Sequence, residues 1–286
     1  MMSHLGLLPA TPPRTLLPPG ACDCHMHIYG DPAVYPSAPN SPFAPVEGGT
    51  IEGYLALQRL LGLTRAVVVQ PSAYGIDNRC TMAAVARMGT EARAVVVVEE
   101  TADDAELERL TRDGARGLRF FMLPGGVLGW DRLAPLAARV APFGWHIQLQ
   151  MDSRFLQDRE AELMRLPCPV VIDHNGKFLE PVTTDHPGFA ALCRLIDSGK
   201  AWVKTSGVYE TSRSGAPEYA DVSVLARTLI ARYPERCVWA TNWPHPSKPG
   251  NPPDDSHLVD LFAKWCGSQE RMHQILVDNP AELYDF

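Results

Sequence analysis

Short apolar runs and longer amphipathic stretches alternate along the whole chain. The short runs are rich in valine, isoleucine and alanine and are mostly continuous, which is the pattern of parallel strands that helices cover. In the longer stretches, apolar residues recur every three or four positions, as they do on one face of a helix. The short runs predict strands over residues 21–29, 65–70, 92–99, 117–122, 145–151, 169–173, 201–205 and 237–241.

A helical pattern follows every predicted strand. Eight strand–helix pairs predict an α/β protein with a single (β/α)8 barrel, the TIM barrel. A doubly wound open sheet is the alternative, but Gly125 and Gly126 lie in a loop that lacks the GxGxxG fingerprint of such sheets. The expected helices cover residues 50–62, 76–88, 102–113, 131–141, 153–165, 186–198, 219–233, 255–266 and 269–284.

Five prolines interrupt residues 1–20, so we expect an N-terminal arm there and one barrel domain over residues 21–286. Of the 286 residues 45% are hydrophobic, which is enough for one large core. The net charge of −7 and the absence of a basic stripe in the sequence argue against a nucleic-acid partner. The seven cysteines are scattered without a CxxC pair, and no signal peptide or long apolar run is found. These features predict a cytoplasmic protein without a membrane segment.

Polar side chains gather where the predicted strands end, and the active sites of such barrels lie at the C-terminal ends of the strands. Alternation places Asp23, His25 and His27 on one side of the first strand. His174 follows the sixth strand and Asn242 the eighth. Because unpaired polar groups are costly to bury, we expect these residues to converge on one site. Further candidates for substrate binding from the strand ends and following loops are Ser72, Tyr74, Arg119, Gln150, Lys177, Lys204, Tyr209, Arg213 and His245.

Some polar residues have a structural interpretation. Asp23 and Asp173 are expected to fix neighbouring groups rather than to carry out chemistry, and Lys204 can pair with Asp173. His146 is assigned to the core. Residues 30–49 are rich in Pro, Gly and Ser, and predict a long loop of the kind that often contributes to function.

Three motifs at the strand ends resemble the amidohydrolase superfamily. They are Asp-x-His-x-His at residues 23–27, Val-Ile-Asp-His-x-Gly-Lys at residues 171–177 and Thr-Asn-Trp-Pro-His at residues 241–245. The likeness extends over residues 18–285 and includes Val-Gln-Pro-Ser-x-x-Gly-x-Asp-Asn, which ends at Asn78. The resemblance implies the barrel fold and adds Asn78 to the candidate substrate-binding residues.

Within this superfamily the chain resembles the metal-independent lactone branch of amidohydrolase-2 type, which includes 2-pyrone-4,6-dicarboxylate lactonases and D-galactarolactone isomerases. Asn242 stands where the lactonase pattern has Asp, and the motifs at residues 123–126, 174–178 and 207–213 also favour the isomerases. The isomerase pattern lacks a histidine at the position of His25, so this chain departs from it there. The resemblance implies an enzyme that acts on the ester of a small carboxylated lactone, without a cofactor.

Asn242 also bears on the question of a metal. A catalytic zinc ion would need His25, His27, a histidine from the fifth or sixth strand, and an aspartate after the eighth. The fifth strand offers only glutamines, and Asn242 is a neutral amide. His174 can serve as a third ligand, so a three-histidine site stays open beside the expectation that no metal is bound.

Asn242 also bears on which group attacks the lactone carbonyl. An aspartate would titrate near pH ~4 and could take a proton from water, whereas an asparagine cannot. Either a histidine is the base, or the substrate's own hydroxyl attacks its own lactone carbonyl, and proximity replaces an activated water. In the second case the developing oxyanion needs hydrogen-bond donors. The expected donors are His25, His27, His174 and the Asn242 amide, and the expected carboxylate-binding residues are Arg119, Lys177 and Arg213.

Three alternatives to an isomerase remain at this point. The first is a 2-pyrone-4,6-dicarboxylate-type lactonase, a hydrolase in which a histidine is the base. The second is a metal-dependent hydrolase or decarboxylase of the same superfamily. The third is a barrel that binds an acidic sugar without turning it over. In the favoured interpretation, the partner of this protein is a small acidic lactone.

Overall fold

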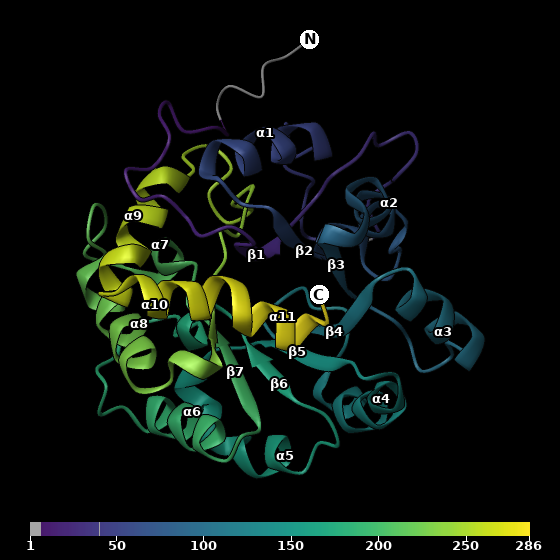
Figure 1. Cartoon of the computed structure of the whole chain (residues 1–286). Coiled ribbons are helices and arrows are strands. Elements are labelled where there is room, and N and C mark those ends of the chain that lie inside the picture. Colours follow the sequence, from purple (N-terminus) through teal and green to yellow (C-terminus); the bar gives the residue numbers. More distant parts are fainter. Residues whose placement is uncertain (1–6, 40) are drawn as a thin grey trace.

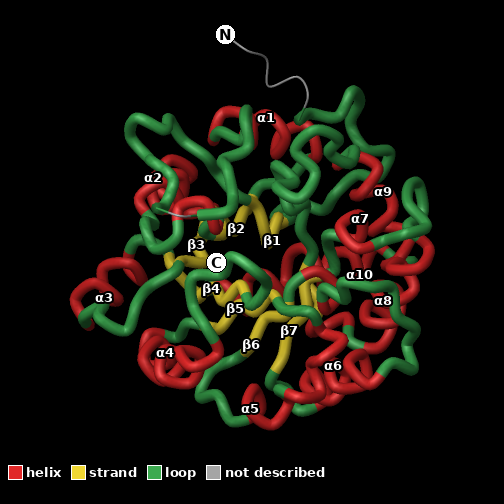
Figure 2. Tube along the Cα trace, turned by 180° about the vertical axis from the view of Figure 1, so that it is seen from behind, coloured by secondary structure: helices red, strands yellow, loops and turns green. Residues whose placement is uncertain are grey.

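The computed structural model describes residues 7–39 and 41–286, and its centre is one sheet of eight parallel strands in the order β1 to β8. Figures 1 and 2 show these strands at the centre of a ring of helices. Backbone hydrogen bonds from Cys24 to Trp239 and from Asn242 to His25 join the two ends of the sheet and close the barrel. The predicted (β/α)8 barrel is confirmed. The strands are β1 (Cys22–Met26), β2 (Arg65–Val69), β3 (Ala92–Val96), β4 (Ala115–Phe121), β5 (His146–Gln150), β6 (Val170–Ile172), β7 (Ala201–Lys204) and β8 (Cys237–Val238).

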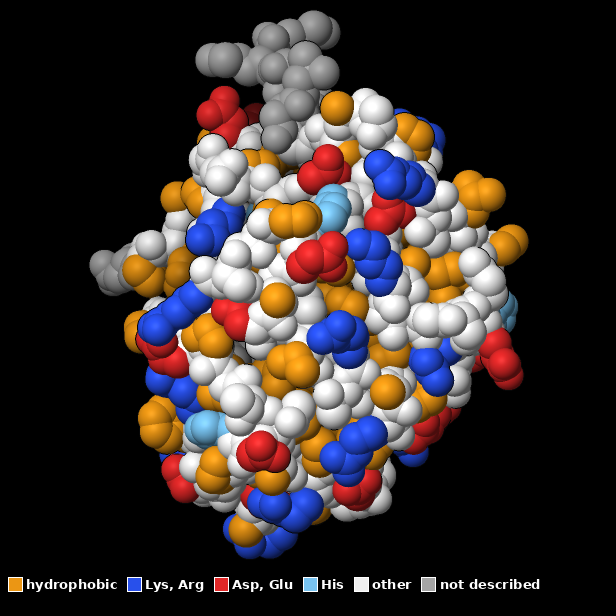
Figure 3. Space-filling view, turned by 90° about the vertical axis from the view of Figure 1, so that its left-hand side faces the viewer, with side chains coloured by type: hydrophobic (Ala, Val, Ile, Leu, Met, Phe, Trp, Pro, Cys, Tyr) orange, Lys and Arg blue, Asp and Glu red, His pale blue; other side chains and the backbone are white. Residues whose placement is uncertain are grey.

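The helices pack their apolar faces against the outside of the barrel, where they bury one continuous hydrophobic cluster. None of the helices in the described residues is long and apolar enough to span a membrane. On the face in Figure 3, acidic and basic side chains are interspersed. The helices are α1 (Ile51–Leu61), α2 (Arg79–Met88), α3 (Asp104–Arg112), α4 (Leu133–Val140), α5 (Glu160–Met164), α6 (Pro187–Asp197), α7 (Val208–Thr211), α8 (Ala220–Arg232), α9 (Asp255–Cys266), α10 (Gln269–His273) and α11 (Asn279–Tyr284).

Several predicted boundaries were wrong for identifiable reasons. The strand predicted over residues 237–241 ends at Val238, because the N–H of Thr241 donates to the Asp23 carboxylate instead of to a neighbouring strand. The helix predicted over residues 153–165 is a 3₁₀ segment, Ser153–Asp158, followed by α5. The helix predicted over residues 269–284 contains a π turn just before Pro280, which has no N–H to continue an α-helical ladder.

The first strand breaks the predicted alternation. Its pairing with β2 is irregular between Asp23 and Met26. Asp23 points toward the helices, where it accepts hydrogen bonds from Tyr54 and Thr241, while Cys24 packs in the inner cluster of the barrel. The placement of Asp23 on the same side as His25 was therefore wrong, because a bulge in the strand separates them.

Residues 7–20 of the predicted arm lie against the barrel. The backbone N–H groups of Arg14 and Thr15 donate to Asp260, and Ser256 donates to the carbonyl of Thr11. Trp243, in the loop after β8, donates to the carbonyl of Leu7. These contacts attach the arm to α9 and to the strand-end loops. Residues 1–6, the first part of the expected arm, lie outside the described residues.

Candidate active site

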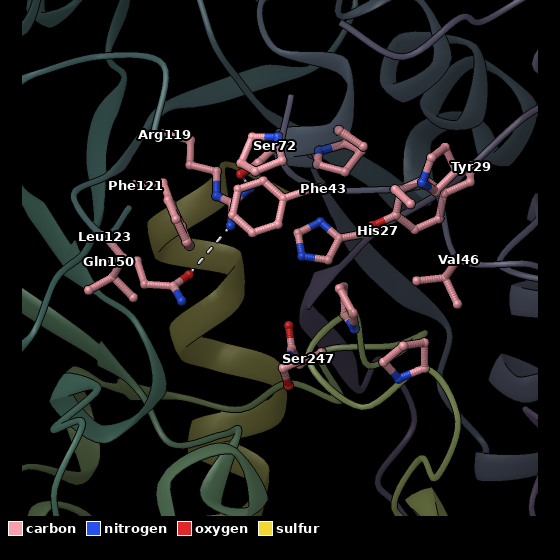
Figure 4. Close-up of a pocket in the computed structure, with 18 of the residues that line it drawn as sticks. His27, Tyr29, Phe43, Val46, Ser72, Arg119, Phe121, Leu123, Gln150 and Ser247 are labelled. Atoms are coloured by element: carbon pink, nitrogen blue, oxygen red, sulfur yellow. Dashed lines mark hydrogen bonds between the residues drawn. The ribbon is translucent and has the colours of Figure 1, made fainter. Parts of the chain in front are cut away.

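A cavity of about 340 Å³ opens at the C-terminal ends of the strands. Its inner wall is polar, and its outer wall is apolar and includes Pro42–Val46 from the long loop after β1. Figure 4 shows Phe43 and His27 on one side, and Arg119 with Gln150 on the other. The loop predicted over residues 30–49 thus contributes to the cavity. The candidate residues that line it are His27, Ser72, Arg119, Gln150, His174, Lys177 and Asn242.

The other candidates lie outside the cavity lining. His25 and Lys204 are fully buried in the barrel, and Tyr209 and His245 are buried beside Asn242. The remaining three serve loops and the surface. Asn78 exchanges hydrogen bonds with the backbone of Val97, Tyr74 accepts one from the N–H of Gly30, and exposed Arg213 pairs with Glu180.

Two neutral histidines from β1 and the loop after it form one wall. His27 Nδ1 lies 2.8 Å from the carbonyl oxygen of Val69 and must donate to it, so His27 Nε2 is an acceptor. His25 Nε2 lies 3.3 Å from this atom and donates to it. Burial, with a smaller contribution from the charge of Arg119, lowers the pKa of His27 to about 3. The expectation that these two histidines donate to a lactone carbonyl is not supported, because both N–H groups of the pair point to protein acceptors.

The ammonium group of Lys204 is buried next to His25. Its Nζ donates to the carbonyl of Cys24 at 2.8 Å and to Gln148 Oε1 at 2.6 Å, and it lies 3.3 Å from His25 Nδ1. Asp173 Oδ1 is 3.7 Å away, and both charged side chains are fully buried. The predicted pairing of Lys204 with Asp173 is present. Lys204 holds Asp173 ionised, since its charge lowers the pKa of that carboxyl against the opposing effect of burial.

Lys204 also determines whether a metal fits. The described residues contain one cluster with metal-ligand chemistry, formed by His25, Asp173 and His174, whose ligand atoms lie within 4.8 Å of one another. The ammonium group of Lys204 already contacts the ligand atoms of His25 and Asp173. A divalent cation bound there would be repelled by this ammonium at short range. The cluster therefore does not fit a metal ion while Lys204 is protonated.

Two hydrogen-bond donors follow β6 beside the His25–His27 wall, and the ring of His174 lies 4.9 Å from that of His25. His174 and Lys177 both have positive φ, at 53° and 49°, and this tight turn directs both into the cavity. Gly207 makes room for the turn, because a Cβ at that position would lie 2.8 Å from His174 Nδ1. His174 Nε2 lies 3.8 Å from the Glu210 carboxylate, which favours the tautomer with the proton on Nε2. His174 Nδ1 then accepts a hydrogen bond from the Ser206 hydroxyl at 3.0 Å. Burial lowers the pKa of His174 to about 4, so the ring is neutral.

Glu210, on α7, is a site residue that the sequence interpretation missed. Its carboxylate pairs with Lys177 and accepts a hydrogen bond from Asn242 Nδ2 at 3.3 Å. Burial alone would raise its pKa, but Lys177 and His174 lower it to about 2. The signal was present in the motif over residues 207–213, but Glu210 comes six residues after Lys204, the last residue of β7, so the strand-end pattern does not select it.

Arg119 on β4 is the buried cation of the cavity that lacks a carboxylate partner among the described residues. It donates to the carbonyl of Gln70 at 2.6 Å, to Ser72 Oγ at 3.3 Å and to Gln150 Oε1 at 3.4 Å, all of them neutral groups. Its guanidinium lies 5.3 Å from the centre of the Phe121 ring. A buried cation with neutral partners is a binding site for an anionic group of a ligand.

Comparison with known proteins now identifies the family. The sequence profile described as "Amidohydrolase" matches residues 22–286. The chain belongs to this amidohydrolase family. It is 39% identical over 281 residues to a D-galactarolactone isomerase of Agrobacterium fabrum, covering 97% of this chain and 95% of the relative. It is 34% identical over 282 residues to a 2-pyrone-4,6-dicarboxylate hydrolase of Comamonas testosteroni, covering 95% and 92%.

The fold of this amidohydrolase agrees with a solved structure. A crystal structure of an Agrobacterium tumefaciens protein without ligand aligns with a TM-score of 0.89 and 39% identity, over 96% of this chain and 98% of that one. The resemblance that the strand-end motifs carried is confirmed.

Four of the five buried histidines among the described residues predict that this amidohydrolase is destabilised by mild acid. Burial lowers the pKa of His27 and His146 to about 3, that of His174 to about 4, and that of His25 well below its ordinary value. Below pH ~6.5 the unfolded chain binds protons that the folded chain does not, so each histidine removes ~1.4 kcal/mol of stability per pH unit. Urea unfolding at pH 7, 6 and 5 should therefore show a steep loss. Asp23 opposes it in part, because burial raises its pKa to about 6.

A substitution of His146 tests this loss of stability without changing the cavity lining. Neither of its ring nitrogens has a hydrogen-bond partner in the described residues. His146→Leu should reduce the pH slope by ~1.4 kcal/mol per unit. An unchanged slope in His146→Leu would mean that this imidazole is protonated in the folded protein.

Proposed function

We propose that this amidohydrolase isomerises a small carboxylated lactone by intramolecular acyl transfer. The observation that carries the proposal is one cavity with three separate functions: an unpaired buried cation at Arg119, donors at His174 and Lys177, and the neutral amide of Asn242 where an ionised base would stand. The names of the relatives, a lactone isomerase and lactone hydrolases, support the same substrate class.

The proposed reaction uses these groups as follows. Arg119 binds the carboxylate of the lactone, and the N–H of His174 and the ammonium of Lys177 donate to the carbonyl oxygen as it becomes an oxyanion. A hydroxyl of the same substrate attacks the carbonyl carbon, and the ring C–O bond breaks. The proton of the attacking hydroxyl ends on the released ring oxygen, so no water is consumed.

The proposal also includes a reaction without a metal and a place in the catabolism of sugar acids. The ammonium group of Lys204 among the candidate ligands supports the first part. We further propose a cytoplasmic location, which the seven free and buried cysteines support.

Hydrolysis is the second candidate, and it is supported by two relatives that are named as hydrolases, one of 2-pyrone-4,6-dicarboxylate and one of 4-sulfomuconolactone. Product analysis separates the two reactions, because isomerisation gives a second lactone and hydrolysis gives the open acid. The first experiment is therefore an NMR assay of the purified protein on aldaric, aldonic and pyrone lactones. An absence of turnover on the whole set would contradict both candidates.

The substitution Asn242→Asp should convert isomerisation into hydrolysis. It places a carboxylate in the cavity that can accept a proton from water, and a positioned general base typically contributes ~100-fold or more. We expect the ratio of open acid to isomerised lactone, measured by NMR, to rise by about that factor. Asn251→Asp makes the same chemical change on an exposed loop and should not alter the ratio. If Asn242→Asp leaves the ratio unchanged, Asn242 does not decide which nucleophile attacks.

A further inference from the structure

A buried chain of hydrogen bonds runs from α9 to the cavity through Asn242. Asn242 Nδ2 lies 2.8 Å from the Tyr209 hydroxyl, which lies 2.8 Å from His245 Nδ1. His245 Nε2 lies 3.1 Å from Asp255 Oδ2. Each of these four residues is at most 6% exposed. Only Asn242 lines the cavity, so the other three residues can act on a substrate only through it.

Glu210 sets the direction of this chain. Its carboxylate is ionised and accepts hydrogen bonds only, so the end of the Asn242 amide that faces it, at 3.3 Å, must be the NH2 group. The second proton of that NH2 group then goes to the Tyr209 oxygen. Tyr209 must use its own proton to donate to His245 Nδ1, and His245 donates from Nε2 to Asp255. The opposite direction would place the Asn242 carbonyl oxygen against the Glu210 carboxylate, where two acceptors would repel each other.

We propose that this chain fixes the Asn242 carboxamide with its oxygen toward the cavity, where it accepts a hydrogen bond from the attacking hydroxyl of the lactone. Tyr209, His245 and Asp255 are then positioning residues. The assignment rests on the proposed function for its effect on the reaction, but not for the orientation itself. It replaces the expectation that the Asn242 amide donates to the oxyanion, because both of its protons are held by Tyr209 and Glu210.

The chemical consequence is an acceptor that orients a hydroxyl without removing its proton. Hydrogen bonds to both protons of the amide polarise the group and strengthen its oxygen as an acceptor. An oriented hydroxyl of the bound lactone gains the advantage of intramolecular attack. A water molecule at the same oxygen is not activated, since an amide is too weakly basic to deprotonate it.

The side-chain amide signal of Asn242 tests the orientation directly. In 15N-labelled full-length protein this signal is identified by its loss in Asn242→Asp. With both protons in buried hydrogen bonds, their exchange with solvent should be slow. Tyr209→Phe removes one acceptor and should shift the signal and accelerate exchange of the amide protons by about 10-fold, as expected for one lost buried hydrogen bond. An unchanged signal and exchange rate in Tyr209→Phe would overturn the chain, whatever the catalytic result.

Kinetics on the lactone that the wild type isomerises give the second measurement. Tyr209→Phe should lower kcat by about 10-fold with KM changed less than about 2-fold, because the carboxylate and carbonyl contacts remain. Tyr219→Phe is the matched control, since Tyr219 lies outside the cavity lining and outside this chain of hydrogen bonds, and it should leave both the amide signal and kcat unchanged. If the amide signal responds while no lactone is turned over by the wild type, the orientation stands and the proposed function fails.

A second pair of variants keeps the test available if Tyr209→Phe does not fold. His245 has a φ of 62°, a conformation that asparagine tolerates, and an asparagine oxygen can replace Nδ1 as the acceptor for Tyr209. His245→Asn should therefore preserve slow exchange of the Asn242 amide, while His245→Ala should lose it. Equal exchange in the two variants would overturn the positioning role of His245.

Discussion

Arg119→Gln should lower kcat/KM for a carboxylated lactone by about 100- to 1,000-fold, the range expected when a buried charge pair loses one partner. Among the described residues the guanidinium has only neutral partners, at Gln70, Ser72 and Gln150. The carboxylate of the substrate is therefore its first anionic partner, and a glutamine at this position can donate a hydrogen bond but has no charge.

The measurement that separates binding from folding compares two lactones. Arg119→Gln should lower kcat/KM by this large factor for a lactone acid. For the corresponding methyl ester, which has no charge, the decrease in kcat/KM should be small. Arg213→Gln is the matched control, because that side chain is 70% exposed and lies outside the cavity. An equal loss on the acid and the ester would assign Arg119 a role in the fold instead.

The barrel was predictable because its signal is repeated. Each of the eight strands is a short buried run followed by an amphipathic helix, so an error at one boundary does not change the strand count. Errors fell where a side chain replaces a backbone partner. Asp23 accepts a hydrogen bond from the N–H of Thr241, and β8 ends early. The local propensities of residues 237–241 cannot indicate a contact with a residue more than 200 positions away.

Prediction of the site was more uneven, for a geometric reason. Residues that immediately follow a strand, such as His174 and Asn242, can be placed at the barrel mouth from the strand pattern alone. The direction in which each side chain points depends on backbone turns with positive φ, which occur at both residues and cannot be deduced from alternation. The sequence therefore predicts that Asn242 lies near the cavity, but it does not predict which end of the amide faces the cavity. That property depends on Glu210.

Lys204 connects the fold to the chemistry, and its replacement should have the largest effect on stability. Lys204→Met should lower the free energy of unfolding by about 3–5 kcal/mol, because it leaves the fully buried Asp173 without its cation. Methionine fills a similar volume, so the loss reports the charge rather than a cavity. The measurement is urea unfolding at pH 7, with Lys200→Met as the matched control. Lys200 precedes the same strand, is less buried, and among the described residues its side chain donates only to backbone carbonyls. Its replacement should therefore lower the free energy of unfolding by less than about 1.5 kcal/mol.

The double variant Asp173→Asn/Lys204→Met distinguishes the two roles of this pair. If the destabilisation comes from an uncompensated carboxylate, removing that charge should restore at least about half of the lost stability. Activity should not return with it, because His25 would still lack the ammonium that donates to its Nδ1 and so fixes the proton on Nε2 facing His27. Recovery of both stability and activity would instead show that neutral side chains at positions 173 and 204 serve the site equally well. The buried ammonium would then not be needed to hold the two histidines in their tautomers.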